Sequence, residues 1–274
     1  MKYVLLSVAA LVLCFGLSFF IAGQVRKRMK RKPPHAVHIL ICVAAGLTVI
    51  GAACAIFLNI HYKADRKAIA AFADSSASKV TKIDDGYFID GKGEDTALVF
   101  YPGAKVDTDA YLPLMYQLAD NGIDCFLLEM PFRMAIFNPN AADKVMGRYD
   151  YDTWLTAGHS MGGMIAASYA AAHESVDGVV LLAAYPTKQL PEHTALLSVY
   201  GTNDKVLDRG AYEKSKKYFP ADAAEVVIEG GNHAQFANYG KQSGDGEATI
   251  SHDEQQAQTV SAIIEYAENI KGSE

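Results

Sequence analysis

The residues with the clearest chemical potential form the segment Gly158-His159-Ser160-Met161-Gly162, a G-x-S-x-G pattern. Apolar residues precede this segment and small, apolar residues follow it, which predicts a buried strand, one tight turn and a helix. A serine at the tip of such a turn has its hydroxyl raised above the sheet. The flanking glycines have no side chains and therefore leave room for the crowded backbone. The N–H of Met161 then lies at a helix N-terminus, where it stabilises a developing oxyanion. The pattern therefore predicts Ser160 as a nucleophile and Met161 as an oxyanion donor.

A nucleophilic serine needs a base within hydrogen-bond reach and a carboxylate that orients the base. In open α/β sheets, functional loops follow the carboxyl ends of strands. Asp204 lies four residues past one predicted strand, and His233 lies five residues past the next in a Gly-rich loop. The resulting chain order is Ser160, then Asp204, then His233. We expect these three side chains to meet, with Asp208 as the alternative carboxylate.

A second oxyanion donor is expected in the loop after the predicted strand 96–101. Gly103 permits a close approach of the backbone there, so we predict that the N–H of Ala104 is this donor. Lys105 in the same loop, and Arg133 in a later one, are each either an attractor for an anionic substrate or a solvated surface charge.

The elements that must position these residues alternate between strands and helices, which predicts an α/β fold with a mostly parallel sheet flanked by helices. Several predicted strands are continuously apolar, as expected when helices cover both faces of a sheet. The predicted strands are a hairpin over 79–90, then 96–101, 122–130, a strand leading to Ser160, 176–184, 195–200 and 224–228. The predicted helices include 107–120, 208–219 and an amphipathic one over 253–271.

Two uncharged apolar segments, about 3–23 and 36–60, precede these elements and are each long enough to cross a bilayer. We therefore expect a two-helix transmembrane hairpin over residues 1–63. A signal peptide is the competing interpretation of the first segment, but its apolar stretch is long and its basic cluster follows it. Beyond the hairpin we expect a polar, helix-prone linker over 64–78 and a catalytic domain over 79–274.

The orientation of the hairpin follows from its Lys and Arg residues. The loop between the two apolar segments holds six basic residues, against four flanking them: Lys2, Lys63, Arg66 and Lys67. We therefore expect a multi-pass protein of the cell membrane with an extracytoplasmic catalytic domain.

The charge of the chain is divided unevenly. Residues 1–63 contain eight Lys and Arg and no Asp or Glu, whereas residues 64–274 contain 17 basic and 31 acidic residues. An acidic domain repels a phosphate backbone, so we expect no nucleic-acid partner. The four cysteines lack metal-ligand spacing, and we expect neither a metal nor a cofactor.

Four segments together resemble the α/β-hydrolase superfamily: YPGAKVDTDAYLPLMYQLADNGIDCFLLEMPF, GHSMGG, YGTNDKV and GGNHAQFANYGKQSGDG. They are most similar to its compact branch of bacterial membrane-anchored or secreted hydrolases related to dienelactone hydrolases. The resemblance covers roughly residues 79–270 and implies Ser160 as nucleophile, Asp204 as acid and His233 as base. One departure is Pro102-Gly103, where the family has His-Gly, which keeps the backbone donor and removes a polar side chain.

The expected activity is that of a serine hydrolase that cleaves an ester or thioester of a small-molecule acyl substrate through an acyl-enzyme intermediate. The short segment between Met130 and Tyr151 leaves little room for a lid and favours small or accessible acyl groups. Two alternatives stay open: an amide or peptide hydrolase with the same triad, and a non-catalytic, membrane-tethered binding domain on this scaffold.

Overall fold

The computed structural model describes residues 2–28, 34–91, 93 and 95–271, and it divides into two compact units, Met1–Ile60 and His61–Glu274. The first unit holds helices α1 (Lys2–Arg28) and α2 (His35–Asn59), which pack against each other. Among the described residues, one segment, Ala36–Cys54 of α2, is long and apolar enough to cross a membrane. The first predicted span lies on α1, partly outside the residues whose side chains are described, so the two-span hairpin stays a prediction.

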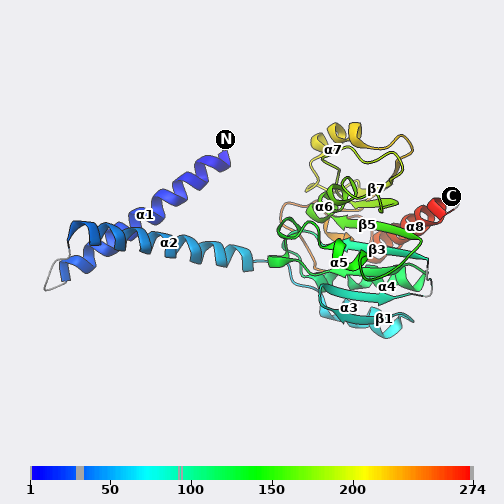
Figure 1. Ribbon diagram of the computed structural model, residues 1–274, viewed down its shortest axis with the longest axis horizontal. Helices are drawn as coiled ribbons and strands as arrows, with labels where there is room; N and C mark the ends of the chain where they lie inside the picture. Colours follow the sequence, from blue (N-terminus) through cyan, green and yellow to red (C-terminus); the bar gives the residue numbers. More distant parts are fainter. Residues whose placement is uncertain (1, 29–33, 92, 94, 272–274) are drawn as a thin grey trace. The chain divides into compact units, whose positions relative to one another are not determined.

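The second unit is built on one eight-stranded sheet with the order β1-β2-β4-β3-β5-β6-β7-β8 (Figure 1). Strands β3 to β8 run parallel to one another, and the hairpin β1–β2 pairs antiparallel with β4 at one edge. The predicted mostly parallel α/β fold is therefore confirmed. The strands are β1 Lys79–Ile83, β2 Gly86–Asp90, β3 Thr96–Tyr101, β4 Asp124–Leu128, β5 Thr153–His159, β6 Gly178–Leu182, β7 Ala195–Gly201 and β8 Ala224–Ile228.

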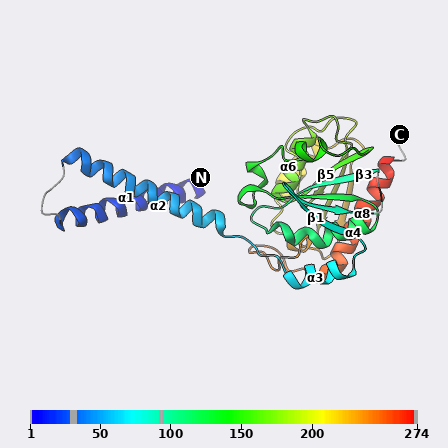
Figure 2. The same cartoon turned by 60° about the horizontal axis from the view of Figure 1, so that its bottom comes forward.

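Helices cover both faces of this sheet (Figure 2). On one face lie α4 (Leu112–Asp120) and α8 (His252–Lys271), and on the other lie α5 (Ala142–Met146) and α6 (Met161–Ala170). Alternate residues of each central strand supply the two cores, because successive side chains of a strand point to opposite faces. In β5, for example, Leu155 packs towards α4 and α8 while Trp154 packs towards α6. Helix α7 (Arg209–Ser215) follows β7.

Residues 64–78, the expected linker, lie in the second unit and include a helix. Helix α3 (Arg66–Ser75) is capped by Asp65, whose side chain accepts hydrogen bonds from the N–H groups of Lys67 and Ala68, and it packs against α4. The hydroxyls of Ser76 and Ser78 both donate to Asp120. Local sequence does not specify these contacts, because they join the segment to elements far along the chain.

The carboxyl ends of β3, β5, β7 and β8 lie at one edge of the sheet, since these strands run parallel. The loops that follow them hold Ala104, Ser160, Asp204 and His233. The topology thus brings the loops of all the predicted site residues to the same edge.

Candidate active site

The turn between β5 and α6 is strained at the predicted nucleophile. Ser160 has φ 54° and ψ −124°, a conformation that non-glycine residues rarely adopt. Its N–H donates to the carbonyl of Leu182 on β6 at 2.9 Å, which ties the turn to the sheet. A Cβ on Gly162 would lie 2.0 Å from the carbonyl oxygen of Tyr101, so only glycine fits there. The turn therefore raises Ser160 at the sheet edge and places Met161 at the start of α6.

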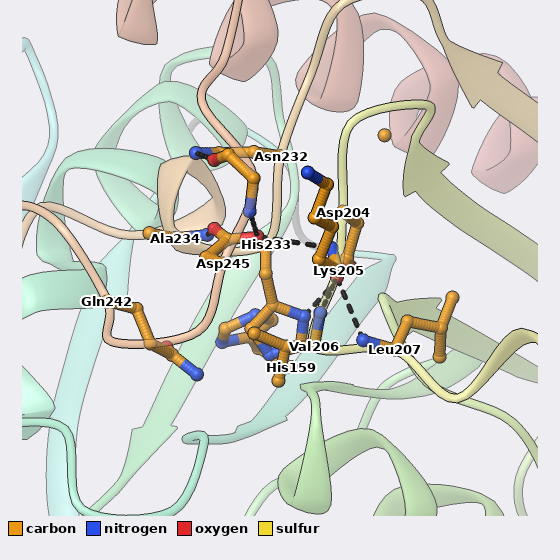
Figure 3. A network of polar contacts seen from close by, with 12 residues as sticks. His159, Asp204, Lys205, Val206, Leu207, Asn232, His233, Ala234, Gln242 and Asp245 are labelled. Carbon is orange, nitrogen blue, oxygen red and sulfur yellow. Dashed lines mark hydrogen bonds and ion pairs between the residues drawn. The ribbon is translucent and has the colours of Figure 1, made fainter.

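The loops after β7 and β8 bring His233 and Asp204 together, with 2.8 Å between His233 Nδ1 and Asp204 Oδ2 (Figure 3). Both side chains are buried. The other carboxylate oxygen of Asp204 accepts hydrogen bonds from the backbone N–H groups of Val206 and Leu207, each at 2.8 Å. These bonds fix the carboxylate, which in turn holds the imidazole of His233 by Nδ1.

Asp208, the alternative carboxylate, has a different partner. Its side chain accepts a hydrogen bond from the N–H of Ala211 at 2.9 Å and so caps helix α7. The carboxylate hydrogen-bonded to His233 is that of Asp204.

Ser160, Met161 and His233 line one cavity of about 350 Å³. The rest of its lining is mostly apolar: Ile136, Met164, Ile165, Ala183, Ala184, Tyr185, Val206, Leu207 and Asp208. Small-molecule sites commonly have this character, an apolar wall with a few convergent polar groups. Ala104 is not among the lining residues, so the structure brings together four of the five predicted site residues and leaves Ala104 outside this group.

Asp245, for which the sequence predicts no role, joins the loop of Asp204 to the loop of His233. Its Oδ2 accepts a hydrogen bond from the N–H of Ala234, next to His233, at 2.9 Å. Its Oδ1 accepts from the N–H of Lys205, next to Asp204, at 3.3 Å. The only sequence signal for this connection is the G-D-G pattern itself, which does not name its partners.

The residue before His233 is held just as firmly. The buried side chain of Gln255 on α8 accepts from the N–H of Asn232 at 2.9 Å and donates to its carbonyl oxygen at 2.8 Å. The side chain of Asn232 donates to the carbonyl of Gly246 at 2.8 Å. Backbone contacts on both sides of His233 therefore fix where its imidazole points.

His159, the residue before the predicted nucleophile, belongs to a second buried network. Its Nδ1 lies 2.9 Å from the hydroxyl of Tyr111, and that hydroxyl accepts the N–H of Gly103 at 2.9 Å. The rings of His159 and His233 have centroids 4.5 Å apart. Burial, reinforced by the neighbouring His233, holds the pKa of His159 well below its usual value, so this imidazole is neutral. The network ties the loop of Gly103 to His159, whose ring lies near that of His233.

Lys105 and Arg133 meet through the backbone: the N–H of Lys105 donates to the carbonyl of Arg133 at 2.8 Å. The Nε of Arg133 also donates to Asp107 at 2.7 Å. Neither residue lines the cavity of Ser160. Among the described residues, no group of three or more His, Cys, Asp or Glu side chains is arranged to hold a metal ion.

Comparison with protein families supplies the classification. A family model described as "Alpha/beta hydrolase family" matches residues 97–257, more than half of the chain. The chain belongs to this family. The match includes β3 and the loops that carry Ser160, Asp204 and His233 in this hydrolase. No curated protein matches the sequence.

Solved structures resemble this hydrolase in fold. Est1E from Butyrivibrio proteoclasticus has a TM-score of 0.52 and 13% identity, over 72% of this chain and 100% of that chain. TT1662 from Thermus thermophilus has a TM-score of 0.47 and 14% identity, over 68% and 96% of the two chains. A Thermogutta terrifontis esterase 2 phosphoramylated by tabun has a TM-score of 0.46 and 14% identity, over 70% and 95%.

Proposed function

We propose that this protein is a serine hydrolase that cleaves an ester or thioester through an acyl-enzyme intermediate, with Ser160, His233 and Asp204 as its triad. The observation that carries the proposal is the buried hydrogen bond between His233 and Asp204, at a cavity that Ser160 also lines. Membership of the alpha/beta hydrolase family supports the hydrolytic chemistry.

In the first half-reaction, Ser160 Oγ attacks the carbonyl carbon of the substrate and its proton passes to His233 Nε2. Asp204 stabilises the imidazolium through Nδ1. The N–H of Met161, at the start of α6, donates to the oxyanion of the tetrahedral intermediate, with the N–H of Ala104 proposed as the second donor. The intermediate then collapses, and His233 gives its proton to the departing alcohol or thiol.

In the second half-reaction, His233 takes a proton from water as the water oxygen attacks the acyl carbon on Ser160. The new tetrahedral intermediate releases a carboxylic acid, and the proton on His233 returns to Ser160 Oγ. This step returns the enzyme to its starting state, and water is the co-reactant that the two half-reactions consume.

The dimensions of the cavity favour a small acyl group. Its volume of about 350 Å³ lies at the low end of the range for small-molecule sites. The segment between β4 and β5 holds only short helical turns and the five-residue α5, so no large lid covers the site. The resemblance of the sequence to the compact branch related to dienelactone hydrolases also supports a small acyl group.

We also propose that residues 3–23 and 36–60 form a membrane hairpin with the catalytic domain outside the cytoplasm. The apolar segment Ala36–Cys54 and the basic cluster between the two segments support this topology. Protease added to spheroplasts should digest the domain from about residue 64 onwards. Complete protection in spheroplasts, with digestion after lysis, would show the opposite orientation.

The triad is tested by labelling the full-length protein in detergent with a fluorophosphonate and mapping the modified peptide. We expect the adduct on Ser160, its loss in Ser160→Ala and its weakening in His233→Ala. Ester turnover should fall about 10⁶-fold in Ser160→Ala, as for other triad serines. An unlabelled, folded protein would favour the non-catalytic binding domain, and labelling with turnover of amides alone would change the substrate class.

A further inference from the structure

We propose that an apolar rim beside the catalytic cavity docks on the lipid bilayer, so that the site receives esters that reside in the membrane surface. The apolar rim consists of Phe132, Ile136 and Phe137. Its docking is a property of the surface, whereas the substrate class rests on the proposed hydrolase function.

The three side chains of the apolar rim are unusually exposed for their type. Phe132, Ile136 and Phe137 have exposed fractions of 55%, 55% and 53%. The two phenylalanine rings touch edge to face with centroids 5.7 Å apart, so the exposed surface is continuous. Ile136 also lines the cavity of Ser160. A contiguous apolar patch at the mouth of a site is typical of a surface that meets a partner.

The backbone conformation at Phe132 and Arg133 accounts for the exposure of the apolar rim at Phe132. Phe132 and Arg133 have φ values of 53° and 56°, which cost about 1–3 kcal/mol each at residues other than glycine. Arg133 is held in place because its carbonyl accepts the N–H of Lys105 at 2.8 Å and its Nε donates to Asp107 at 2.7 Å. These contacts fix the conformation that turns Phe132 outwards.

The chain enters the catalytic unit at this same place. The N–H of Tyr62 donates to the carbonyl of Lys105 at 2.7 Å, and the N–H of Asp107 donates to the carbonyl of Tyr62 at 2.9 Å. His61 Nε2 lies 3.1 Å from Asp107 Oδ1, the oxygen that also binds Arg133. Asp107 therefore connects the entry point of the chain to the segment that carries the apolar rim.

A lipid surface is the occupant that this connection favours. The apolar segment of α2 ends at Cys54, seven residues before His61, and seven residues reach roughly 25 Å at most. If that segment spans a membrane, chain length alone keeps the entry point, and with it the apolar rim, near the lipid headgroups. Transfer of an exposed phenylalanine side chain from water into the apolar part of a bilayer surface is favourable.

The consequence for the substrate concerns its alcohol part. A small acyl group fits the cavity at Ser160, while a long alkyl chain of the alcohol can stay in the lipid and pass Ile136 on the way in. We therefore expect esters that combine a short acyl group with a membrane-embedded alcohol. The bond that breaks, and the route of each proton, are those of the proposed hydrolase.

Docking is tested without reference to catalysis by quenching of tryptophan fluorescence in nanodiscs that contain brominated lipid. The full-length protein carries Phe137→Trp, and the matched control carries Val227→Trp on β8, where the native side chain is 45% exposed. The single native tryptophan, Trp154, is buried and gives a common background. We expect strong quenching of Phe137→Trp and little of Val227→Trp. Equal quenching, or failure of the full chain to incorporate into nanodiscs, would overturn the docking.

The substrate class is tested with two alkyl acetates that share the same acyl group, hexadecyl acetate in the nanodisc and ethyl acetate in solution. We expect the double variant Phe132→Ser/Phe137→Ser to lose about tenfold in kcat/KM on hexadecyl acetate and to keep its rate on ethyl acetate. Val227→Ser should match the wild type on both. Equal effects on the two esters would overturn the substrate class, whereas quenching without turnover of any ester would overturn the proposed function and leave the docking intact.

Discussion

Asp245 Oδ2 accepts a hydrogen bond from the backbone N–H of Ala234 at 2.9 Å, while its second oxygen accepts from the N–H of Lys205 at 3.3 Å. One carboxylate thus bridges the residue after His233 and the residue after Asp204. The relative position of the His233 and Asp204 loops therefore depends on the backbone contacts of a third side chain.

Asp245→Asn should reduce kcat/KM on a soluble ester about tenfold, because the single remaining acceptor oxygen of the amide cannot serve both loops. Hydrogen bonds to charged groups contribute about 1.5–3 kcal/mol, so stability should also fall by an amount of this order. The control is Glu247→Gln, which alters an exposed ion pair with Lys241 in the same segment. Steady-state kinetics and thermal unfolding of both variants measure the effect, and equal activities of the two variants would show that Asp245 does not position the triad.

Asp204→Asn should lower kcat about 10⁴-fold, as expected when the amide favours the wrong tautomer of the catalytic histidine. Asp208→Asn provides the comparison, since Asp208 caps α7 and asparagine caps helices about equally well, so this variant should affect activity less than tenfold and keep its stability. The two rates distinguish the carboxylates directly. A larger loss of kcat in the Asp208 variant would show that Asp208, and not Asp204, orients the histidine.

The free energy of unfolding of the second unit, His61–Glu274, should fall below pH 6.5 through His159. Burial lowers the pKa of His159 in the folded state, so the unfolded chain takes up the proton first as the pH falls. The contribution of His159 to the free energy of unfolding is therefore fully present above pH 6.5. Below that pH it falls, with a slope of about 1.4 kcal/mol per pH unit for one proton. Denaturant unfolding at several pH values should give a shallower slope for His159→Gln. Parallel slopes would mean that His159 titrates normally.

Gly162→Ala should prevent the nucleophile turn from forming, because its Cβ would lie 2.0 Å from the carbonyl oxygen of Tyr101. We expect a loss of more than about 3 kcal/mol of stability, in the range of severe strain and overpacking, together with loss of fluorophosphonate labelling. Gly210→Ala in α7 is the matched control, since its Cβ would meet only Asp208 Oδ1 at 3.4 Å. That variant should gain up to about 1 kcal/mol from helix propensity. Similar unfolding midpoints for the two variants would refute the packing argument.

The order of strands and helices, the mostly parallel sheet and the turn at Ser160 could be predicted from the sequence because each depends on local pattern. Apolar runs mark the strands, and the glycines of the G-x-S-x-G segment mark a turn that admits no side chain at Gly162. The positions of Asp204 and His233 after their strands followed from the same alternation. Their catalytic roles stay predictions until labelling and kinetics test them.

The rest depended on contacts between residues distant in the sequence. The polar sequence over 64–78 does not reveal its contacts, and the structure shows α3 packed against α4 within the second unit. The links from Asp245 to Lys205 and from Tyr111 to His159 join different loops, and no local pattern specifies such pairs. Local sequence determined which residues end each strand. The tertiary structure alone decided which of them meet, because hydrogen-bond partners across loops depend on how the whole sheet and its helices pack.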